Sequence, residues 1–254
     1  MPRAYNLYVK SIKGGEANFL ASYDANAFDR PSVAVDVALL TVDSGQLRAA
    51  VYQRSAYPGM GTYALPGGFV RMDESLGDAA QRVLKDKLGL GHVFIEQLYT
   101  FGSPGRDPRT RILSVAHYAL VAPSRFDALE ESGAQSGRVV VDWSGETGGP
   151  ASVLGDEGEA FPLFLDHQDV LGVAVQRIRG KLDYAPVGFQ LLPDSFTLRE
   201  LQEVHEAVRE EPLNKDSFRR RMLASGQLHA TGERQRNVSN RPAELYRFNR
   251  RSAV

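Results

Sequence analysis

Residues 99–111 (YTFGSPGRDPRTR) combine aromatic side chains, turn-forming glycines and prolines, and three arginines. Guanidinium groups bind pyrophosphate oxygens through paired hydrogen bonds, and an aromatic ring such as that of Phe101 stacks on a nucleotide base. We therefore predict a nucleotide-binding loop in which Arg106 or Arg109 contacts the ligand, with Arg54 on a preceding strand as a weaker candidate. The alternative is a structural turn whose arginines are only solvated.

A second group of charged residues lies near the C-terminal end. From Pro212 onward the chain has ten Lys or Arg against three Asp or Glu, a net charge of +7, whereas the preceding residues carry −8. A basic module joined to an acidic body is typical of a nucleic-acid-binding domain attached to a second domain. The alternative is a solvated basic surface.

The basic residues of this part fall on one expected helix and one expected loop. In residues 215–223 (KDSFRRRML), Phe218, Met222 and Leu223 can face a core while the charged residues face outward. Such a helix can enter a DNA major groove, and a basic loop can reach the backbone or minor groove. The candidate DNA-contacting residues are Lys215, Ser217, Arg219 and Arg220 on the helix and Arg234, Arg236 and Arg241 on the loop. Three consecutive arginines cannot share one face, so Arg221 is expected to be an internal salt-bridge partner.

Hydrophobic patterning predicts the elements that must position these residues. The predicted elements before residue 125 are strands at 32–42, 46–54, 63–70, 93–101 and 112–121, and an amphipathic helix at 74–87 that stops at Gly89. Residues 133–158 contain seven glycines and are predicted to be a surface insertion without regular structure. Residues 166–182 then read as a helix, capped by Asp166, that links two halves of the chain.

The pattern after Pro193 is helical with short connections. Thr197 and Glu200 have the spacing of a capping box and begin a helix that runs to about Arg209. A second helix is expected from about residue 213 to Gly226. Short strands at 227–232 and 243–248 enclose a polar loop. Helix, turn, helix, strand, loop, strand is the order of a winged helix-turn-helix.

The sequence from Gly68 to Leu90 resembles the Nudix box, G-x5-E-x7-R-E-U-x-E-E-x-G-U, where U is aliphatic. Gly68, Glu74, Arg82, Gly89 and both aliphatic positions match. The resemblance implies a Nudix α/β/α sandwich whose pocket is retained, with Gly68 and Glu74 among the candidate ligand-binding residues. For Glu74 the alternative role is that of an acid at a helix start, which the helix dipole favours.

In Nudix hydrolases the second half of the box supplies glutamates spaced i, i+3 and i+4, which share one helix face and hold divalent cations. The corresponding residues in this chain are Val83, Asp86 and Lys87. A second unit positive charge about 4 Å from the Lys87 ammonium is repelled by about 4 kcal/mol at an effective dielectric constant of about 20. We therefore predict no metal site, no cofactor, no catalytic residue and no hydrolysis.

Nearly the whole chain resembles the NrtR family of Nudix-related transcriptional regulators. The resemblance is carried by residues 30–36, 63–70, 96–102, 105–109, 190–202, 218–220, 231–233 and 241–248. It implies an α+β protein with a Nudix-like effector-sensing domain at 1–165, a linker helix at 166–182 and a winged helix-turn-helix domain at 183–254.

The same resemblance implies a homodimeric repressor of NAD-metabolism genes. Such a protein binds a palindromic double-stranded operator and leaves it when ADP-ribose or a related nucleotide binds. Three alternatives stay open: a hydrolase of ADP-ribose-like nucleotides with an atypical metal site at Glu74 and Asp86, a sugar-catabolism regulator of the same architecture, and a scaffold whose winged helix binds protein. The effector, the target genes and the direction of regulation are not fixed by the sequence.

Composition excludes several other classes of protein. The chain has no cysteine, which excludes disulfides and thiolate metal sites. It has no apolar run approaching the roughly 18–20 residues of a membrane span, and its first residues lead into no apolar signal segment. We expect a cytoplasmic protein that does not contact membranes.

Overall fold

The computed structural model describes residues 15–129, 132–143, 148–182, 185–236 and 242–249. The chain divides into two compact units, one up to Pro31 and one from Ser32 onward. In the first unit the described element is helix α1 (Gly15–Ser22), which has no buried residue. None of the described helices is long and apolar enough to cross a membrane.

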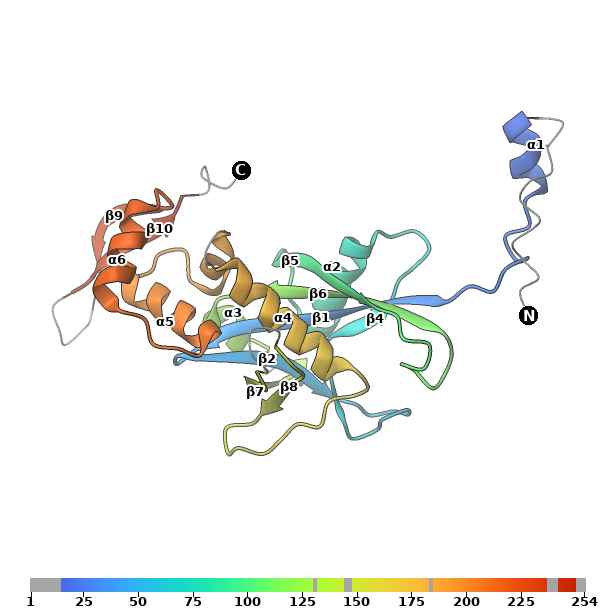
Figure 1. Ribbon diagram of the computed structural model, residues 1–254, viewed down its shortest axis with the longest axis horizontal. Coiled ribbons are helices and arrows are strands. Elements are labelled where there is room, and N and C mark those ends of the chain that lie inside the picture. Colours follow the sequence, from blue (N-terminus) through green and yellow to red (C-terminus); the bar gives the residue numbers. More distant parts are fainter. Residues whose placement is uncertain (1–14, 130–131, 144–147, 183–184, 237–241, 250–254) are drawn as a thin grey trace. The chain divides into compact units, whose positions relative to one another are not determined.

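The second unit is built on a mixed sheet of eight strands (Figure 1). The strands are β1 (Ser32–Asp43), β2 (Gln46–Gln53), β3 (Tyr63–Ala64), β4 (Gly67–Phe69), β5 (Phe94–Phe101), β6 (Ile112–Leu120), β7 (Gln135–Val141) and β8 (Ala151–Leu154). Their order is β5-β6-β1-β2-β7-β8, with β3 beside β2 and β4 beside β1. Only the β1–β6 pairing is parallel among the described strand pairs of this sheet. The five predicted strands are confirmed, and the Pro-Gly-Gly break divides the third into β3 and β4.

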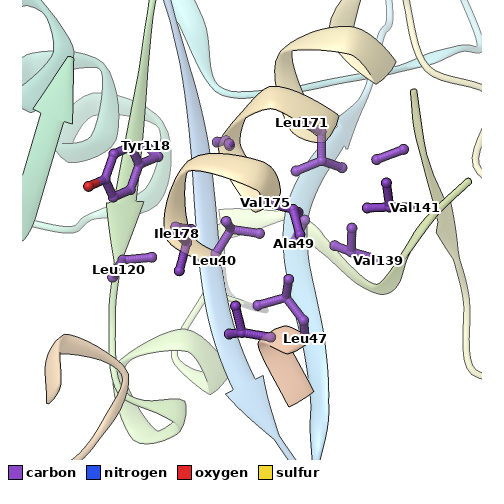
Figure 2. Packing of buried hydrophobic residues seen from close by; sticks show 14 of the residues in the cluster. Leu40, Leu47, Ala49, Tyr118, Leu120, Val139, Val141, Leu171, Val175 and Ile178 are labelled. Carbon is purple, nitrogen blue, oxygen red and sulfur yellow. The ribbon is translucent and has the colours of Figure 1, made fainter. Parts of the chain in front are cut away.

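Two helices cover opposite faces of the sheet, as the predicted α/β/α sandwich requires. Alternate residues of β1 point to the two sides because side chains of a strand alternate. Val35, Val37 and Leu39 pack with the buried face of α2 (Leu76–Leu88). Ala38, Leu40 and Val42 pack with the buried face of α4 (His167–Lys181), whose Val175 and Ile178 lie on either side of Leu40 in Figure 2. Burial on both faces explains why β1 reads as a nearly continuous apolar run.

The glycine-rich segment 133–158 is not the irregular surface loop that its composition predicts. It contains β7, which pairs with β2, and β8, which pairs with β7. Its glycines allow close packing: a Cβ on Gly137 would lie 2.4 Å from Val153 Cγ1, and one on Gly149 would lie 2.3 Å from the Asp142 carbonyl oxygen. The prediction is wrong because glycine at points of close backbone approach and glycine in a flexible loop look alike in a sequence. Residues 144–147 lie outside the described part.

Helix α4 covers the sheet as well as leading toward the C-terminal part. Its apolar stripe is buried in the same cluster as β1, β2 and β7. Asp166 occupies the N-cap position but its side chain makes no capping hydrogen bond. The predicted cap is therefore wrong, because the carboxylate of Asp166 is used in an ion pair with Arg106.

The C-terminal part has the predicted winged helix order. It comprises the 3-10 helix η2 (Pro186–Leu191), α5 (Leu198–Arg209), α6 (Lys215–Ala224), β9 (Leu228–Arg234) and β10 (Glu244–Phe248). One further short helix, α3 (Pro123–Asp127), lies in the sandwich between β6 and β7. The capping box is confirmed, since Thr197 and Glu200 exchange side-chain to backbone hydrogen bonds. Phe218 and Met222 lie in the small core of this part, but Leu223 is 46% exposed, so its predicted burial is wrong.

Contacts cross between the two predicted domains. The Trp143 indole, just after β7, donates a 2.7 Å hydrogen bond to the Glu210 carboxylate at the end of α5. Val204, Ala207 and Val208 of α5 belong to the same buried cluster as β2 and α4. The winged helix therefore packs directly on the sandwich, while the exact division at residues 165 and 183 stays a prediction.

Candidate functional site

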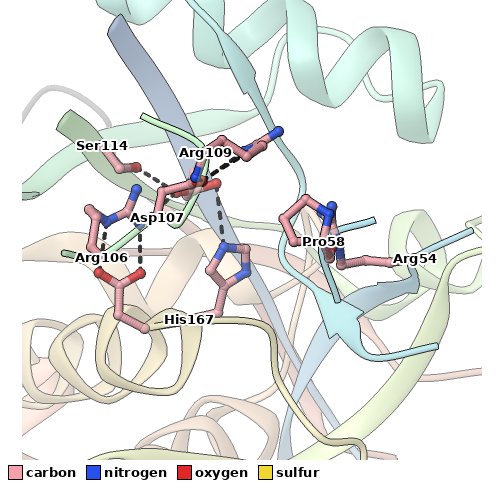
Figure 3. Close-up of polar contacts among 9 residues, drawn as sticks. Arg54, Pro58, Arg106, Asp107, Arg109, Ser114 and His167 are labelled. Atoms are coloured by element: carbon pink, nitrogen blue, oxygen red, sulfur yellow. Dashed lines mark hydrogen bonds and ion pairs between the residues drawn. The ribbon is translucent and has the colours of Figure 1, made fainter. Parts of the chain in front are cut away.

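A cavity of about 210 Å³ lies where β1, β4, the loop after β5 and the start of α4 meet. Its polar lining residues are Asp36, Arg54, Lys87, Arg106, Asp107, Arg109 and His167, and its nonpolar lining includes Gly67, Gly68, Phe69 and Phe164. Figure 3 shows the arginines, Asp107 and His167 around this space. The arrangement brings together side chains that are more than 100 residues apart in the chain.

The two glycines of the Pro-Gly-Gly break allow the backbone to approach the cavity closely. A Cβ on Gly67 would lie 2.2 Å from a carboxylate oxygen of Asp36, and one on Gly68 would lie 3.2 Å from Val83 of α2. No larger residue fits at Gly67 without displacing Asp36. Glycine at 67 is therefore required by the close approach of Asp36, and glycine at 68 is favoured by the packing of α2.

Asp36 is a buried carboxylate at the centre of a polar network. It accepts a hydrogen bond from the Ser114 hydroxyl, and it lies 3.6 Å from the Arg106 guanidinium and 3.8 Å from His167 Nε2. His167 Nδ1 accepts a 2.9 Å hydrogen bond from the Leu65 backbone N–H, which places the imidazole proton on Nε2. Burial lowers the pKa of His167 despite the nearby carboxylate. His167 is thus a neutral donor facing Asp36.

Two arginines of the predicted binding loop have carboxylate partners. Arg106 donates to both oxygens of Asp166, at 2.8 and 2.6 Å. Burial opposes its charge, but the hydrogen bond and the attraction of Asp166 outweigh burial and raise the pKa of Arg106. Arg109 donates to both oxygens of Asp107, at 2.9 and 2.7 Å, and this pairing lowers the pKa of Asp107.

Two other cavity cations have no such partner. Arg54 Nε donates to the Pro58 carbonyl at 2.9 Å, and its guanidinium lies 3.9 Å from the centre of the Phe164 ring. Lys87 Nζ lies 5.7 Å from the centre of the Tyr52 ring. Among the described residues, neither Arg54 nor Lys87 has a carboxylate oxygen within 4 Å. Burial is the main cause that lowers the pKa of Arg54 and of Lys87. A neighbouring arginine charge also lowers each pKa, while Asp107 opposes the shift of Arg54 and Asp36 opposes that of Lys87.

The cavity collects four of the six residues that the sequence singled out for ligand binding: Arg54, Gly68, Arg106 and Arg109. Glu74 does not line it, because its carboxylate accepts two hydrogen bonds from Arg82 and one from the Arg71 backbone N–H. Phe101 does not line it either and packs edge-to-face on Tyr99, with ring centres 5.4 Å apart.

Sequence reasoning did not single out Asp36, Asp107, Phe164 or His167 as lining residues. Asp36 carried a usable signal, since it is a charged residue inside an apolar run that must be buried on both faces. His167 carried none, because its place beside Leu65 depends on how α4 docks on the sheet.

A Nudix fold implies a divalent cation, and the second half of the box does not fit one. Val83 is 2% exposed within the apolar cluster under α2. Asp86 lies 3.8 Å from the Arg82 guanidinium, and Lys87 contributes a positive charge to the cavity. Within the described ranges, no group of three or more His, Cys, Asp or Glu residues is placed to hold a metal ion.

A second candidate site lies on the winged helix. Phe218 and Met222 anchor α6 in the core, so that the opposite face of the helix is exposed. The exposed candidates are Lys215, Ser217, Arg219 and Arg220 on α6 and Arg234 and Arg236 at the end of β9 and after it. A groove of about 810 Å³ lies between α5, α6 and the β9–β10 hairpin. Its charged lining residues are the cations Lys215, Arg219 and Arg234 with Arg199, and the acids Glu203, Glu206 and Glu244. Helix and hairpin thus present cations to a common surface, as phosphate contacts require.

Two predictions about this surface are not decided by the structure. Arg241 lies outside the described residues. The Arg221 guanidinium lies 5.6 Å from the centre of the Phe218 ring, and its expected salt bridge stays a prediction.

Comparisons with known proteins match both halves of the chain. Residues 30–142 match the NUDIX domain, and residues 188–248 match the NrtR DNA-binding winged helix domain. The ADPR responsive transcriptional repressor NtrR of Acinetobacter baylyi is 35% identical over 235 residues, which are 92% of this chain and 88% of that protein.

A solved structure and a further relative extend the comparison. The structure of Shewanella oneidensis NrtR complexed with a 27mer DNA has a TM-score of 0.70 and 32% identity, and the match covers 85% of this chain and 93% of that chain. The ADP-ribose pyrophosphatase of Methanocaldococcus jannaschii is 35% identical over 85 residues, which are 34% of this chain and 48% of that enzyme. The similarity to the two transcriptional regulators therefore spans both halves of the chain. The similarity to the pyrophosphatase covers only about a third of it.

Proposed function

Because the chain belongs to the NrtR family of Nudix-related transcriptional regulators, we propose that it is a repressor whose winged helix binds operator DNA and whose Nudix cavity binds ADP-ribose. One observation carries the proposal. A small cavity in which Arg54 and Lys87 have no carboxylate oxygen within 4 Å among the described residues, and a winged helix with exposed cations, belong to one compact unit. The Acinetobacter relative is named for its response to ADPR, and the Shewanella relative was solved with a 27mer DNA.

We propose that Arg54 and Arg109 contact the pyrophosphate of the ligand, with Phe69 or Phe164 available to stack on its rings. Arg109 is 46% exposed at its side chain and can exchange part of its contact with Asp107 for a phosphate oxygen. The other proposed features are a homodimer, a palindromic operator and genes of NAD metabolism as targets. A two-fold symmetric protein matches a two-fold symmetric site.

We also propose that the Nudix domain does not hydrolyse its ligand. The two acids that remain from the box, Glu74 and Asp86, both pair with Arg82. Release of AMP from ADP-ribose in the presence of Mg²⁺ or Mn²⁺ would show that the rival hydrolase assignment is the correct one.

DNA binding and release are tested together on the region upstream of the gene. We expect salt-sensitive binding by fluorescence anisotropy and progressive release as ADP-ribose is added. By thermodynamic linkage, ADP-ribose must bind the DNA-free protein more tightly by the same factor that it weakens DNA binding. Unchanged operator affinity at saturating ADP-ribose removes it as the effector.

Charge-matched variants separate specific contacts from general electrostatics. Arg219→Ala combined with Arg236→Ala is expected to reduce the slope of log K against log salt by about two, since each phosphate contact contributes about one. The control is Arg71→Ala combined with Arg138→Ala, which removes the same charge from exposed positions of the sandwich. Equal losses in both double variants would contradict a binding surface on α6 and the hairpin.

A further inference from the structure

We propose that Lys87 is an anion-binding residue that replaces the divalent cation of a Nudix site, so that a diphosphate is held between Arg54 and Lys87 without metal. That the ligand is ADP-ribose rests on the proposed function. That the ligand carries negative charge is inferred from the residues that line the cavity.

The position of Lys87 follows from the packing of α2. Val83 lies directly beneath Gly68, where a Cβ would come within 3.2 Å of the valine methyl group. Lys87 follows one helical turn later on the same face. It lines the cavity together with Arg54, Gly67 and Gly68. The helix position that supplies a metal-binding carboxylate in a Nudix hydrolase therefore supplies an ammonium group here.

The charges around the cavity do not balance without a ligand. Four cations and two carboxylates line it. Asp107 pairs with Arg109, and Asp166 pairs with Arg106. Asp36 lies 3.6 Å from Arg106 and also attracts Lys87, so that the four cations and three carboxylates leave a net charge of +1. Arg54 and Lys87 remain, and like charges gathered at one small cavity repel each other unless an anion lies between them.

Arg54 and Lys87 offer two positively charged groups to a diphosphate. One ammonium and one guanidinium together supply the formal charge of a divalent cation, but they are fixed to the protein and carry no water to activate. A ligand held in this way is bound without being cleaved. A lysine at position 87 then contributes to ligand binding in addition to repelling metal ions.

Calorimetric titration of the full chain with ADP-ribose, and separately with inorganic pyrophosphate, tests this role. In EDTA we expect the same affinity as in Mg²⁺, within about twofold. Loss of one charge-assisted hydrogen bond predicts that Lys87→Met weakens both ligands about tenfold or more, whereas Lys87→Arg keeps most of the affinity. The matched control is Lys85→Met, which removes an exposed lysine that does not line the cavity.

Each other outcome has a defined meaning. Binding that disappears in EDTA and returns with Mg²⁺ overturns the proposal, as does a Lys87→Met variant that binds like the wild type. Pyrophosphate binding without ADP-ribose binding contradicts the proposed effector but upholds the role of Lys87 if Lys87→Met still weakens it. A wild type that binds neither ligand overturns the role of Lys87. Thermal melts of each variant establish folding, and Lys87→Gln replaces Lys87→Met if the latter does not fold.

Discussion

Arg106 and Asp166 form a doubly hydrogen-bonded ion pair, with donor–acceptor distances of 2.8 and 2.6 Å, between the loop after β5 and the residue that precedes α4 (Figure 3). The Arg106 side chain is 5% exposed. The pair connects the loop that forms the cavity wall to the start of α4, so we expect its loss to affect both the cavity and the packing of α4 on the sheet.

Breaking this pair is expected to destabilise the protein strongly. Asp166→Ala leaves the buried guanidinium without its main partner, which costs about 3 kcal/mol of unfolding free energy. Asp36 at 3.6 Å compensates only partly. Urea denaturation measures the change. The control is Asp156→Ala, which removes the 80% exposed partner of Arg48 and is expected to cost less than about 1 kcal/mol. Equal costs would contradict the buried role of Asp166.

Glu74 is expected to contribute to stability rather than to ligand binding. Its hydrogen bonds with Arg82 and the Arg71 N–H lower its pKa from 4.5 to about 2. A depressed carboxyl pKa stabilises the folded state above the unfolded pKa, and this contribution is lost as pH falls toward the folded pKa. Glu74→Gln should therefore lower the melting temperature at pH 7 and flatten its decline between about pH 5 and pH 2. A changed ligand affinity at unchanged stability would contradict this assignment.

The buried His167 is expected to make the stability of the protein depend on pH in a second range, above that of Glu74. Burial lowers its pKa below 6.5, so the unfolded state takes up a proton at a higher pH than the folded state does. Stability is then lost as pH falls below about 6.5. His117, whose pKa burial also lowers, acts in the same direction. Comparing His117→Gln with the double variant His117→Gln plus His167→Gln isolates the contribution of His167, and an identical pH profile in the two excludes it.

The winged helix core offers a direct test of which α6 residues are buried. Phe218 is 3% exposed and packs against His205 with ring centres 5.1 Å apart. Phe218→Ala is expected to cost about 3–5 kcal/mol, whereas Leu223→Ala at an exposed position should change stability by less than about 0.5 kcal/mol. Denaturation followed by circular dichroism compares the two variants. A large loss in Leu223→Ala would indicate that another surface covers this residue.

Features that depend on neighbouring residues were predictable from the sequence. The apolar run of β1, the stop of α2 at Gly89 and the capping box of Thr197 and Glu200 each involve side chains within a few positions of one another. Their hydrogen bonds and burial periodicity are therefore encoded locally. The spacing of Gly68, Glu74 and Arg82 identified the Nudix fold, and the loss of carboxylates at Val83 and Lys87 was visible without a structure.

Features that depend on distant residues were decided only by the tertiary structure. Asp166 pairs with Arg106, 60 positions away, instead of capping its own helix. Gly137 of β7 and Gly149 before β8 lie where a Cβ would meet neighbouring atoms at 2.4 and 2.3 Å, which sequence composition cannot distinguish from a loop. Packing turns Glu74 to Arg82 and leaves Lys87 at the cavity. The sequence by itself determined which residue types were available, and the docking of α2, α4 and the loop after β5 determined which of them meet.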